Sequence, residues 1–186
     1  VKIMKKLLLL FLVAFIVFGV FSCASGSKID TKDIPEFYLN PPVAEDAIYG
    51  VGDAKMSSLS LSRTTAISRA RDDIARQVEV VVKNAITDYA QEAGEGSNTQ
   101  TIQFVETISR QIAQVTLAGV RTVEVEVGKD GTVYALCMYP LAALQEAAST
   151  EFRRNEAAAF AEFKADQALK ALNHELESNP PRAGSR

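Results

Sequence analysis

Glu124 and Glu126 are the pair of side chains whose spacing could support general acid–base chemistry. They stand two residues apart in a segment of alternating polarity, so a β-strand would place both carboxylates on one face. That face is expected to meet water, where carboxylates ordinarily serve to solubilise a strand. The single histidine, His174, lies far away in a polar stretch near the C-terminus. These residues predict no catalytic set, and no enzymatic activity is expected.

Candidate ligands for cofactors and metals are equally sparse. Gly50-x-Gly52 resembles the beginning of a dinucleotide-binding loop, but Lys55 stands where a third glycine is needed. Close packing of a strand against a helix is therefore the preferred interpretation. Metal sites usually take several His or Cys ligands. Apart from Cys23, the chain offers only His174 and Cys137, and Cys137, in an apolar run, is expected to be a small core residue. We expect neither metal nor cofactor.

The clearest candidate for chemistry is Cys23, which follows a small residue at the end of an apolar segment. Lysines at positions 2, 5 and 6 precede an uncharged run of 15 residues, 7–21. A membrane-spanning helix needs roughly 20 residues, so the pattern is typical of a secretory signal peptide. Val20-Phe21-Ser22-Cys23 resembles a lipobox. The resemblance implies transfer of a diacylglyceryl group to the Cys23 thiol and cleavage before it.

These features predict a signal peptide at residues 1–22 and a lipidated tether at 23–33. The lipid on Cys23, with acyl chains such as palmitate, would hold the exported chain on a membrane of the cell envelope. Ala24 provides no acidic retention signal, which favours the outer membrane. A plain signal peptide and an uncleaved anchor are the alternative interpretations.

Composition limits what the exported part can be. Of the 20 basic and 23 acidic residues, the first 22 positions hold three basic ones and no acid, which leaves 17 against 23, a formal charge of −6. Such a domain has no general attraction for nucleic acid, so none is expected as a partner. One cysteine besides Cys23 gives no disulfide framework. The 164 residues that remain correspond to about one domain, stabilised by its core.

Hydrophobic periodicity predicts the elements. Prolines 35, 41 and 42 favour extended chain before the first strand, and the turn 128–131, with Asp-Gly at its centre, predicts a hairpin. We expect an α+β fold, in which a long helix wraps a three-stranded, antiparallel-type sheet. The predicted elements are strands at 48–52, 120–127 and 132–139, helices at 61–93 and 99–115, a long Ala-rich C-terminal helix at 141–177 and a disordered tail at 178–186.

The length of the first helix raises the question of what covers it. Its apolar stripe continues through Val81, Ala85 and Tyr89, beyond the reach of strands of six to eight residues. The strand at 132–139 is also apolar on both faces, which calls for cover on both sides. Self-association would supply that cover, and so would the other helices of the same chain. Both explanations are open, and we expect self-association.

Several short motifs in a fixed order point to a family. They begin with Pro35-Glu36-Phe37 and Asn40-Pro41-Pro42 and end with the hairpin strand that closes at Pro140. Together the motifs resemble the Lpp-twenty family of bacterial envelope lipoproteins over residues 34–140. The central motifs are Ile48-Tyr49-Gly50-Val51-Gly52-Asp53-Ala54, Ala70-Arg71-Asp72-Asp73-Ile74-Ala75, Leu117-Ala118-Gly119-Val120 and Tyr134-Ala135-Leu136-Cys137-Met138-Tyr139.

The resemblance implies an envelope lipoprotein with a fold similar to dodecins, small sheets wrapped by one helix. Some relatives take part in flagellar assembly, and the family transfers no catalytic residue. Phe37 departs from the family, in which Trp is usual at this position, and the Ala-rich helix lies outside the resemblance.

Three functional interpretations follow for the exported domain. The first is a structural or interaction module that binds itself or an envelope protein, and this is the one we favour. The second is a small-ligand-binding, dodecin-like module, or a flagellar or envelope assembly factor. The third, an enzyme, lacks a supporting constellation of residues.

Overall fold

The computed structural model describes residues 31–184 of a chain that divides into two units, Val1–Thr31 and Lys32–Arg186. The predicted signal peptide and Cys23 lie outside the described residues. Between residues 31 and 184, no helix combines the length and the apolar character needed to cross a bilayer. The second unit holds the sheet and the helices predicted from the sequence.

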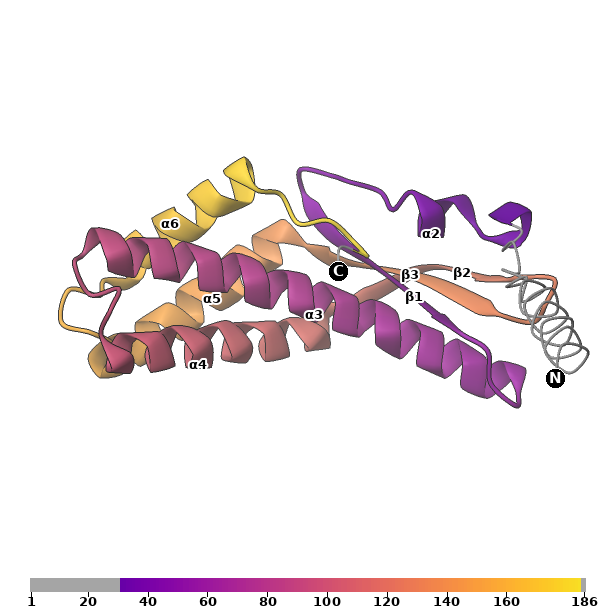
Figure 1. Cartoon of the computed structure of the whole chain (residues 1–186), viewed down its shortest axis with the longest axis horizontal. Coiled ribbons are helices and arrows are strands. Elements are labelled where there is room, and N and C mark those ends of the chain that lie inside the picture. The colour runs from indigo at the N-terminus through magenta and orange to yellow at the C-terminus, as the bar shows by residue number, and fades with distance from the viewer. Residues whose placement is uncertain (1–30, 185–186) are drawn as a thin grey trace, which may run out of the picture. The chain divides into compact units, whose positions relative to one another are not determined.

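Three antiparallel strands form the sheet, in the order β1-β3-β2. They are β1 (Ala47–Ala54), β2 (Arg121–Val127) and β3 (Val133–Pro140). The doubly apolar strand, β3, lies in the centre (Figure 1). One of its faces is buried beneath a helix through Val133, Ala135, Cys137 and Tyr139. On its other face Leu136 is buried, whereas Tyr134 and Met138 are partly exposed.

The turn between β2 and β3 is fastened by a carboxylate. Gly131 has φ +86°, a backbone conformation that glycine adopts freely. Asp130 accepts hydrogen bonds from the Thr132 N–H at 2.9 Å and the Thr132 hydroxyl at 2.7 Å. These bonds, with a smaller contribution from Lys55, lower the pKa of Asp130 from 3.8 to about 2. The predicted Asp-Gly hairpin turn is confirmed.

Helix α3 (Leu59–Glu92) crosses the inner face of the sheet. Ser58 caps it, because its hydroxyl accepts a hydrogen bond from the Leu61 N–H at 3.2 Å. The helix approaches β1 so closely that a Cβ on Gly50 would lie 2.4 Å from the Ala70 carbonyl oxygen, and one on Gly52 equally close to Ala66. These glycines therefore serve helix–strand packing, as predicted, and the α+β fold with its helix-wrapped sheet is confirmed.

The far half of α3 packs on helices of its own chain. Its 34 residues extend about 50 Å, whereas a strand of eight residues covers about 26 Å. Helices α4 (Thr99–Thr116) and α6 (Ala165–Ser178) contact α3, and α5 (Leu141–Asn155) lies against both of them (Figure 1). Val81, Ala85 and Tyr89 are buried there. Helices of the same chain therefore supply the cover for this stripe, which is the alternative to self-association that the sequence leaves open.

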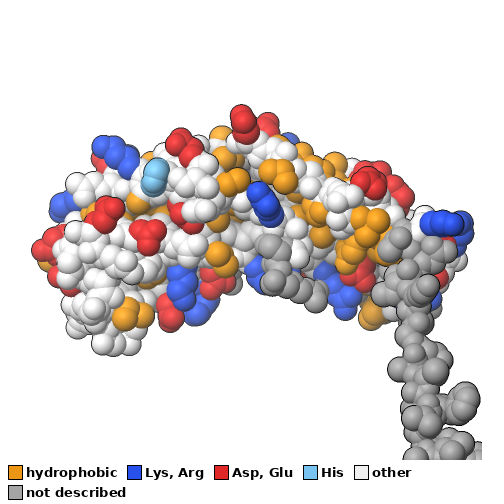
Figure 2. Space-filling view, turned by 45° about the horizontal axis from the view of Figure 1, so that its top comes forward, with side chains coloured by type: hydrophobic (Ala, Val, Ile, Leu, Met, Phe, Trp, Pro, Cys, Tyr) orange, Lys and Arg blue, Asp and Glu red, His pale blue; other side chains and the backbone are white. Residues whose placement is uncertain are grey.

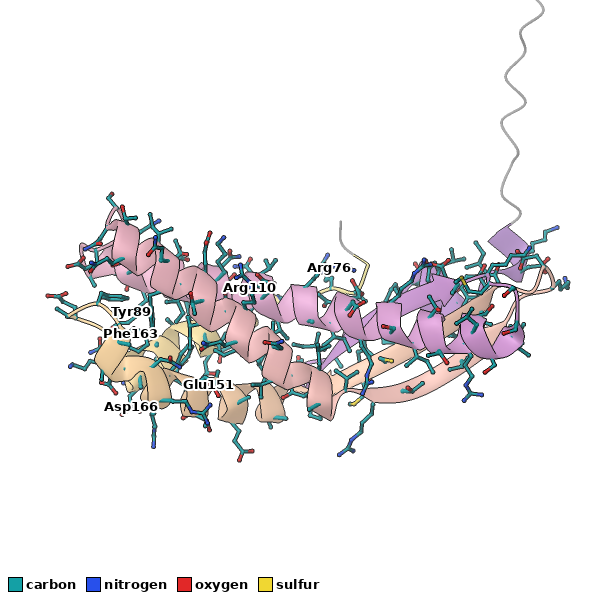
Figure 3. The ribbon with its side chains drawn as sticks, turned by 90° about the horizontal axis from the view of Figure 1, so that it is seen from below. Arg76, Tyr89, Arg110, Glu151, Phe163 and Asp166 are labelled. Carbon is teal, nitrogen blue, oxygen red and sulfur yellow. The ribbon has the colours of Figure 1, made fainter. Side chains whose placement is uncertain are left out.

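The predicted C-terminal helix at 141–177 is wrong as one continuous element. The chain leaves α5 at Asn155, passes through a short 3-10 helix (Glu156–Ala158) and begins α6 at Ala165. The break exists because Phe160 and Phe163 pack on Tyr89, with ring centroids 5.8 and 5.9 Å away. Figure 3 shows Phe163 beside Tyr89. Packing of these two rings, with Phe163 fully and Phe160 partly buried, outweighs the helix propensity of the alanines around them.

Two further local differences concern the sheet. Within the segment expected to be extended, residues Glu36–Leu39 form one helical turn, α2, which Pro35 can precede because its fixed φ suits a helix start. α2 lies on the outer face of the sheet, where the Tyr38 and Tyr134 rings are 5.0 Å apart. In β2 an irregularity between Thr122 and Glu124 interrupts the predicted alternation and leaves Val123 half exposed.

Candidate functional site

Asp73 is the most completely bonded polar side chain that the structure buries. It stands on the sheet side of α3 and is only 3 % exposed. Its Oδ2 atom accepts hydrogen bonds from the Val51 N–H at 3.2 Å, the Gln77 amide at 3.3 Å and the Gly184 N–H at 3.0 Å. Oδ1 accepts one from the Arg76 guanidinium at 3.0 Å. The carboxylate is thus satisfied by four donors and accompanied by one cation.

The Asp73 cluster closes an edge of the sheet. Among the strands that the structure describes, β1 pairs with β3 alone, so its other edge presents backbone groups that need partners. Asp73 takes the Val51 N–H, and the Gln77 amide donates to the Tyr49 carbonyl oxygen at 2.8 Å. Two side chains from consecutive turns of α3 therefore occupy the positions that an added strand would use. Glycines 50 and 52 bring the helix near enough for this contact.

The C-terminal segment completes the cluster. Gly184, whose N–H reaches Asp73, lies in the stretch for which the sequence predicts disorder. On one side of it is a groove of about 580 Å³ lined by Tyr38, Asp53, Arg69 and Asp72 among others. Figure 3 shows Arg76 beside this segment. The segment therefore covers Asp73, whose four donors are all within the chain.

This arrangement favours attachment over chemistry. Donors of the same chain occupy the Asp73 carboxylate through four hydrogen bonds, so few acceptor positions remain for another molecule. Arg76 is mostly exposed, so its ion pair with Asp73 contributes little by itself. What the cluster accomplishes is to fix β1, α3 and the C-terminal segment to one another.

A second groove, of about 630 Å³, lies between α3 and α6. Its walls include His174, Glu175 and Tyr89. Glu175 is nearly buried and accepts hydrogen bonds from Asn84 at 3.2 Å and Asn179 at 3.0 Å. The Tyr89 hydroxyl donates to the Glu162 carbonyl oxygen at 2.7 Å and accepts from the Lys164 N–H at 3.0 Å. The polar groups in this groove thus hold α6 and the preceding loop on α3.

The residues that the sequence singles out for chemistry are not brought together. Glu124 and Glu126 lie exposed on β2, His174 is exposed on α6, and Cys137 is buried in β3. The Cys137 thiol donates to the Thr122 hydroxyl at 3.8 Å, and burial raises its pKa. A thiol that stays protonated is a poor nucleophile, as expected of a core cysteine.

Cys23, the predicted lipidation site, lies outside the described residues. Of residues 31–184, no three or more His, Cys, Asp or Glu side chains are grouped so that they could hold a metal ion.

Sequence reasoning missed Asp73 and Gln77. Asp73 pairs with Arg76, and Arg69, one helical turn before Asp73, donates to the Asp53 carbonyl oxygen at 2.6 Å. A signal was present in the printed sequence. Ala70, Asp73, Ile74 and Gln77 follow one another at helical spacing, so the two polar residues share the face of the alanine and the isoleucine.

Comparison with known proteins gives a family match. A family model described as LPP20 lipoprotein matches residues 35–138, from the start of α2 to near the end of β3. Helices α5 and α6 follow after the matched region. No curated protein and no solved structure matches the chain.

Proposed function

The chain belongs to the LPP20 lipoprotein family, and from this premise we propose that lipid on Cys23 holds it on the outer membrane, where it acts as a structural or interaction module. Family membership implies an envelope lipoprotein anchored by lipid. The lipidation site is proposed because Cys23 follows a small residue, Ser22, at the end of the apolar run 7–21. Two or three acyl chains anchor firmly, since each buried methylene contributes about 0.8 kcal/mol.

Metabolic labelling tests the lipid site. Cells that express the parent chain, Cys23→Ala or Cys137→Ala are given a clickable palmitate analogue. We expect label on the parent and on Cys137→Ala, because the Cys137 thiol is buried and protonated. We expect none on Cys23→Ala. Equal label on Cys23→Ala and on the parent would exclude this lipidation site.

The outer membrane is the proposed location, supported by Ala24, which provides no acidic retention signal. Density-gradient separation of the two membranes tests it, with the parent expected in the outer-membrane fraction. Replacement of Ala24 by Asp serves as the comparison, because an acidic residue after the lipidated cysteine should retain the protein in the inner membrane. Recovery of the parent with inner-membrane markers would refute the location.

The proposed role is non-catalytic. This proposal is supported by the buried polar residues Asp73, Gln77 and Glu175, whose side chains form hydrogen bonds that connect strands and helices. His174→Ala should therefore leave every cellular phenotype of the protein intact. Loss of a phenotype from a variant that still folds would favour an enzyme.

An envelope protein or a second copy is the proposed kind of partner. β2 offers an unpaired edge with Val123 and Val127 about half exposed, which suits contact with another chain. Acidic and basic side chains are interspersed on the face seen in Figure 2, which supports the prediction that nucleic acid is not the partner. Cross-linking in intact cells, followed by mass spectrometry, should yield adducts on β2. Adducts only elsewhere on the unit would exclude this edge.

Binding of a small ligand is the second candidate. It is favoured by the groove of about 630 Å³ between α3 and α6, whose mixed walls include Tyr89, Lys170 and His174. A bound chromophore would appear in the absorbance spectrum of protein purified from membranes. A spectrum with tyrosine and phenylalanine bands alone would exclude a flavin-like ligand.

A further inference from the structure

One end of the second unit gathers three connections, and we call it the entry end: residues 32–33, 55–61 and 128–131. The carboxylate of Asp33 pairs with Lys129 in the hairpin turn. Lys55 pairs with Asp130 across 3.2 Å in the same turn. Figure 1 shows the hairpin, the start of α3 and the point at which the chain enters the unit all at this end. The chain therefore reaches its fold beside the hairpin turn.

The entry end exposes apolar side chains that the described residues leave uncovered. Met56 is 45 % exposed, Leu59 60 % and Leu61 45 %. The first turn of α3 even reverses the usual arrangement, because Ser62 is buried while both leucines face outward. The Ser62 hydroxyl accepts a hydrogen bond from the Met56 N–H at 2.9 Å, which fixes the loop in this orientation. Exposed leucines at a helix start indicate contact with something apolar.

Cationic side chains surround these apolar ones. The Lys55 and Lys129 side chains are 58 % and 84 % exposed, and Arg63 is exposed one turn into α3. Each lysine has one carboxylate partner, so the end carries mixed charge and not a field of one sign. Leucine and methionine flanked by lysine and arginine are the composition of segments that lie in a membrane interface, where the cations meet lipid phosphates.

The position of the predicted lipid anchor indicates that the surface facing the entry end is a membrane. Lys32 follows Cys23 by nine residues, and nine residues span at most about 32 Å when fully extended. The lipid would thus keep the entry end within that distance of the bilayer. The opposite end, at the loop between α3 and α4, lies the length of α3 away, about 50 Å. Of the two ends, the one with exposed leucines is the one that the tether holds at the membrane.

We infer that the entry end docks on the lipid surface that holds the anchor, with Met56, Leu59 and Leu61 at the boundary between headgroups and acyl chains. This inference rests on the proposed lipid anchor. Docking would orient the unit, so that the helical end formed by α4, α5 and α6 points away from the bilayer and meets partners. The lipid supplies the attachment, and the leucines supply the orientation.

Depth-dependent quenching tests the inference on the full lipidated chain. The protein is purified from membranes in detergent and reconstituted in vesicles of phosphatidylethanolamine and phosphatidylglycerol that contain nitroxide-labelled lipid. In a Cys137→Ala background, a fluorophore is attached at Leu59→Cys or, as the matched control, at Ile102→Cys. Ile102 is also exposed, at 48 %, but stands at the helical end. Flotation of the vesicles reports separately whether the chain is anchored.

We expect quenching at position 59 to exceed that at position 102 by at least about threefold, because interfacial side chains lie about 5–10 Å deep. Met56→Asp combined with Leu61→Asp should remove most of that difference, whereas Val80→Asp, another exposed apolar position, should not. Equal quenching at positions 59 and 102 in floated protein would overturn the docking and leave the anchor standing. Protein that fails to float would overturn the anchor, and the docking with it.

Discussion

Asp73 illustrates how one buried carboxylate can join parts of a fold that lie far apart in the sequence. Its carboxylate satisfies the exposed edge of β1 and receives a backbone N–H from Gly184, 111 residues further along the chain. An edge strand with free backbone groups invites unwanted pairing. Asp73 and Gln77 occupy the β1 edge, whereas β2 forms the other edge of the sheet, the one proposed above for contact with another chain.

Removing the Asp73 carboxylate should destabilise the unit strongly. Asp73→Ala removes a buried carboxylate that accepts four hydrogen bonds, two of them from backbone N–H groups, which we expect to lower the free energy of unfolding by about 2–4 kcal/mol. Urea denaturation followed by circular dichroism measures the change. Asp72→Ala is the control. The Asp72 side chain is exposed, so its removal should change the free energy of unfolding by less than about 0.5 kcal/mol. Equal effects of the two substitutions would refute the role given to Asp73.

The hairpin turn should be held by its carboxylate down to strongly acidic pH. Asp130 has its pKa lowered to about 2 from 3.8, first by the Thr132 N–H and then by the Thr132 hydroxyl. The native state therefore binds the proton less readily than the unfolded chain. The contribution of the Asp130 carboxylate to the free energy of unfolding is fully present above pH 4 and is lost as the pH falls through about 2.

An NMR titration of the Asp130 carboxyl carbon checks this pKa. The midpoint should lie near 2, and Thr132→Val, which removes the hydroxyl but keeps the N–H, should raise it part of the way to 3.8. A midpoint near 3.8 in the parent chain would show that the turn is not closed by this carboxylate.

Among the elements, α3 shows both what the sequence could predict and what it could not. Its apolar stripe and its close contact with Gly50 and Gly52 follow from local patterns, and the structure has both. The break after α5 could not be found this way. It depends on Phe160 and Phe163 meeting Tyr89, a contact between segments more than 70 residues apart. Helix periodicity is local, whereas the partner of an apolar face is not.

The same limit explains the expectation of self-association. Val81 belongs to an apolar stripe that the sheet is too short to cover, and the sequence alone does not say whether the cover comes from the same chain. In the structure it is α4 and α6 that approach this half of α3. Val81 is 5 % exposed, whereas its neighbour Val80 is 56 % exposed.

Glutamate substitutions at Val81 and Val80 distinguish packing against helices of the same chain from packing against a second copy. Val81→Glu should lower the free energy of unfolding by about 3–5 kcal/mol, because it places a carboxylate in the core. Val80→Glu should be nearly neutral. Urea denaturation combined with sedimentation measures both. A folded monomer produced by Val81→Glu from an oligomeric parent would contradict intramolecular cover.

At the scale of the whole molecule, the sheet and helices form a unit that carries its own core, and the family implies that lipid attaches it to the envelope. The core supplies stability without a disulfide, since Cys137 is a free buried thiol. If the entry end docks as inferred, the membrane fixes the direction in which the helical end points. Anchoring by lipid is therefore the claim on which location and orientation both depend.

Mass spectrometry of the N-terminal peptide of the protein extracted from membranes tests that claim most directly. We expect the mature chain to begin at Cys23 and to carry a diacylglyceryl group on its thiol, so that the peptide is heavier than its sequence by the mass of the lipid. The same preparation from Cys137→Ala should give an identical peptide. A mature chain that begins at another residue, or a Cys23 peptide with the mass of its amino acids alone, would contradict the lipid anchor.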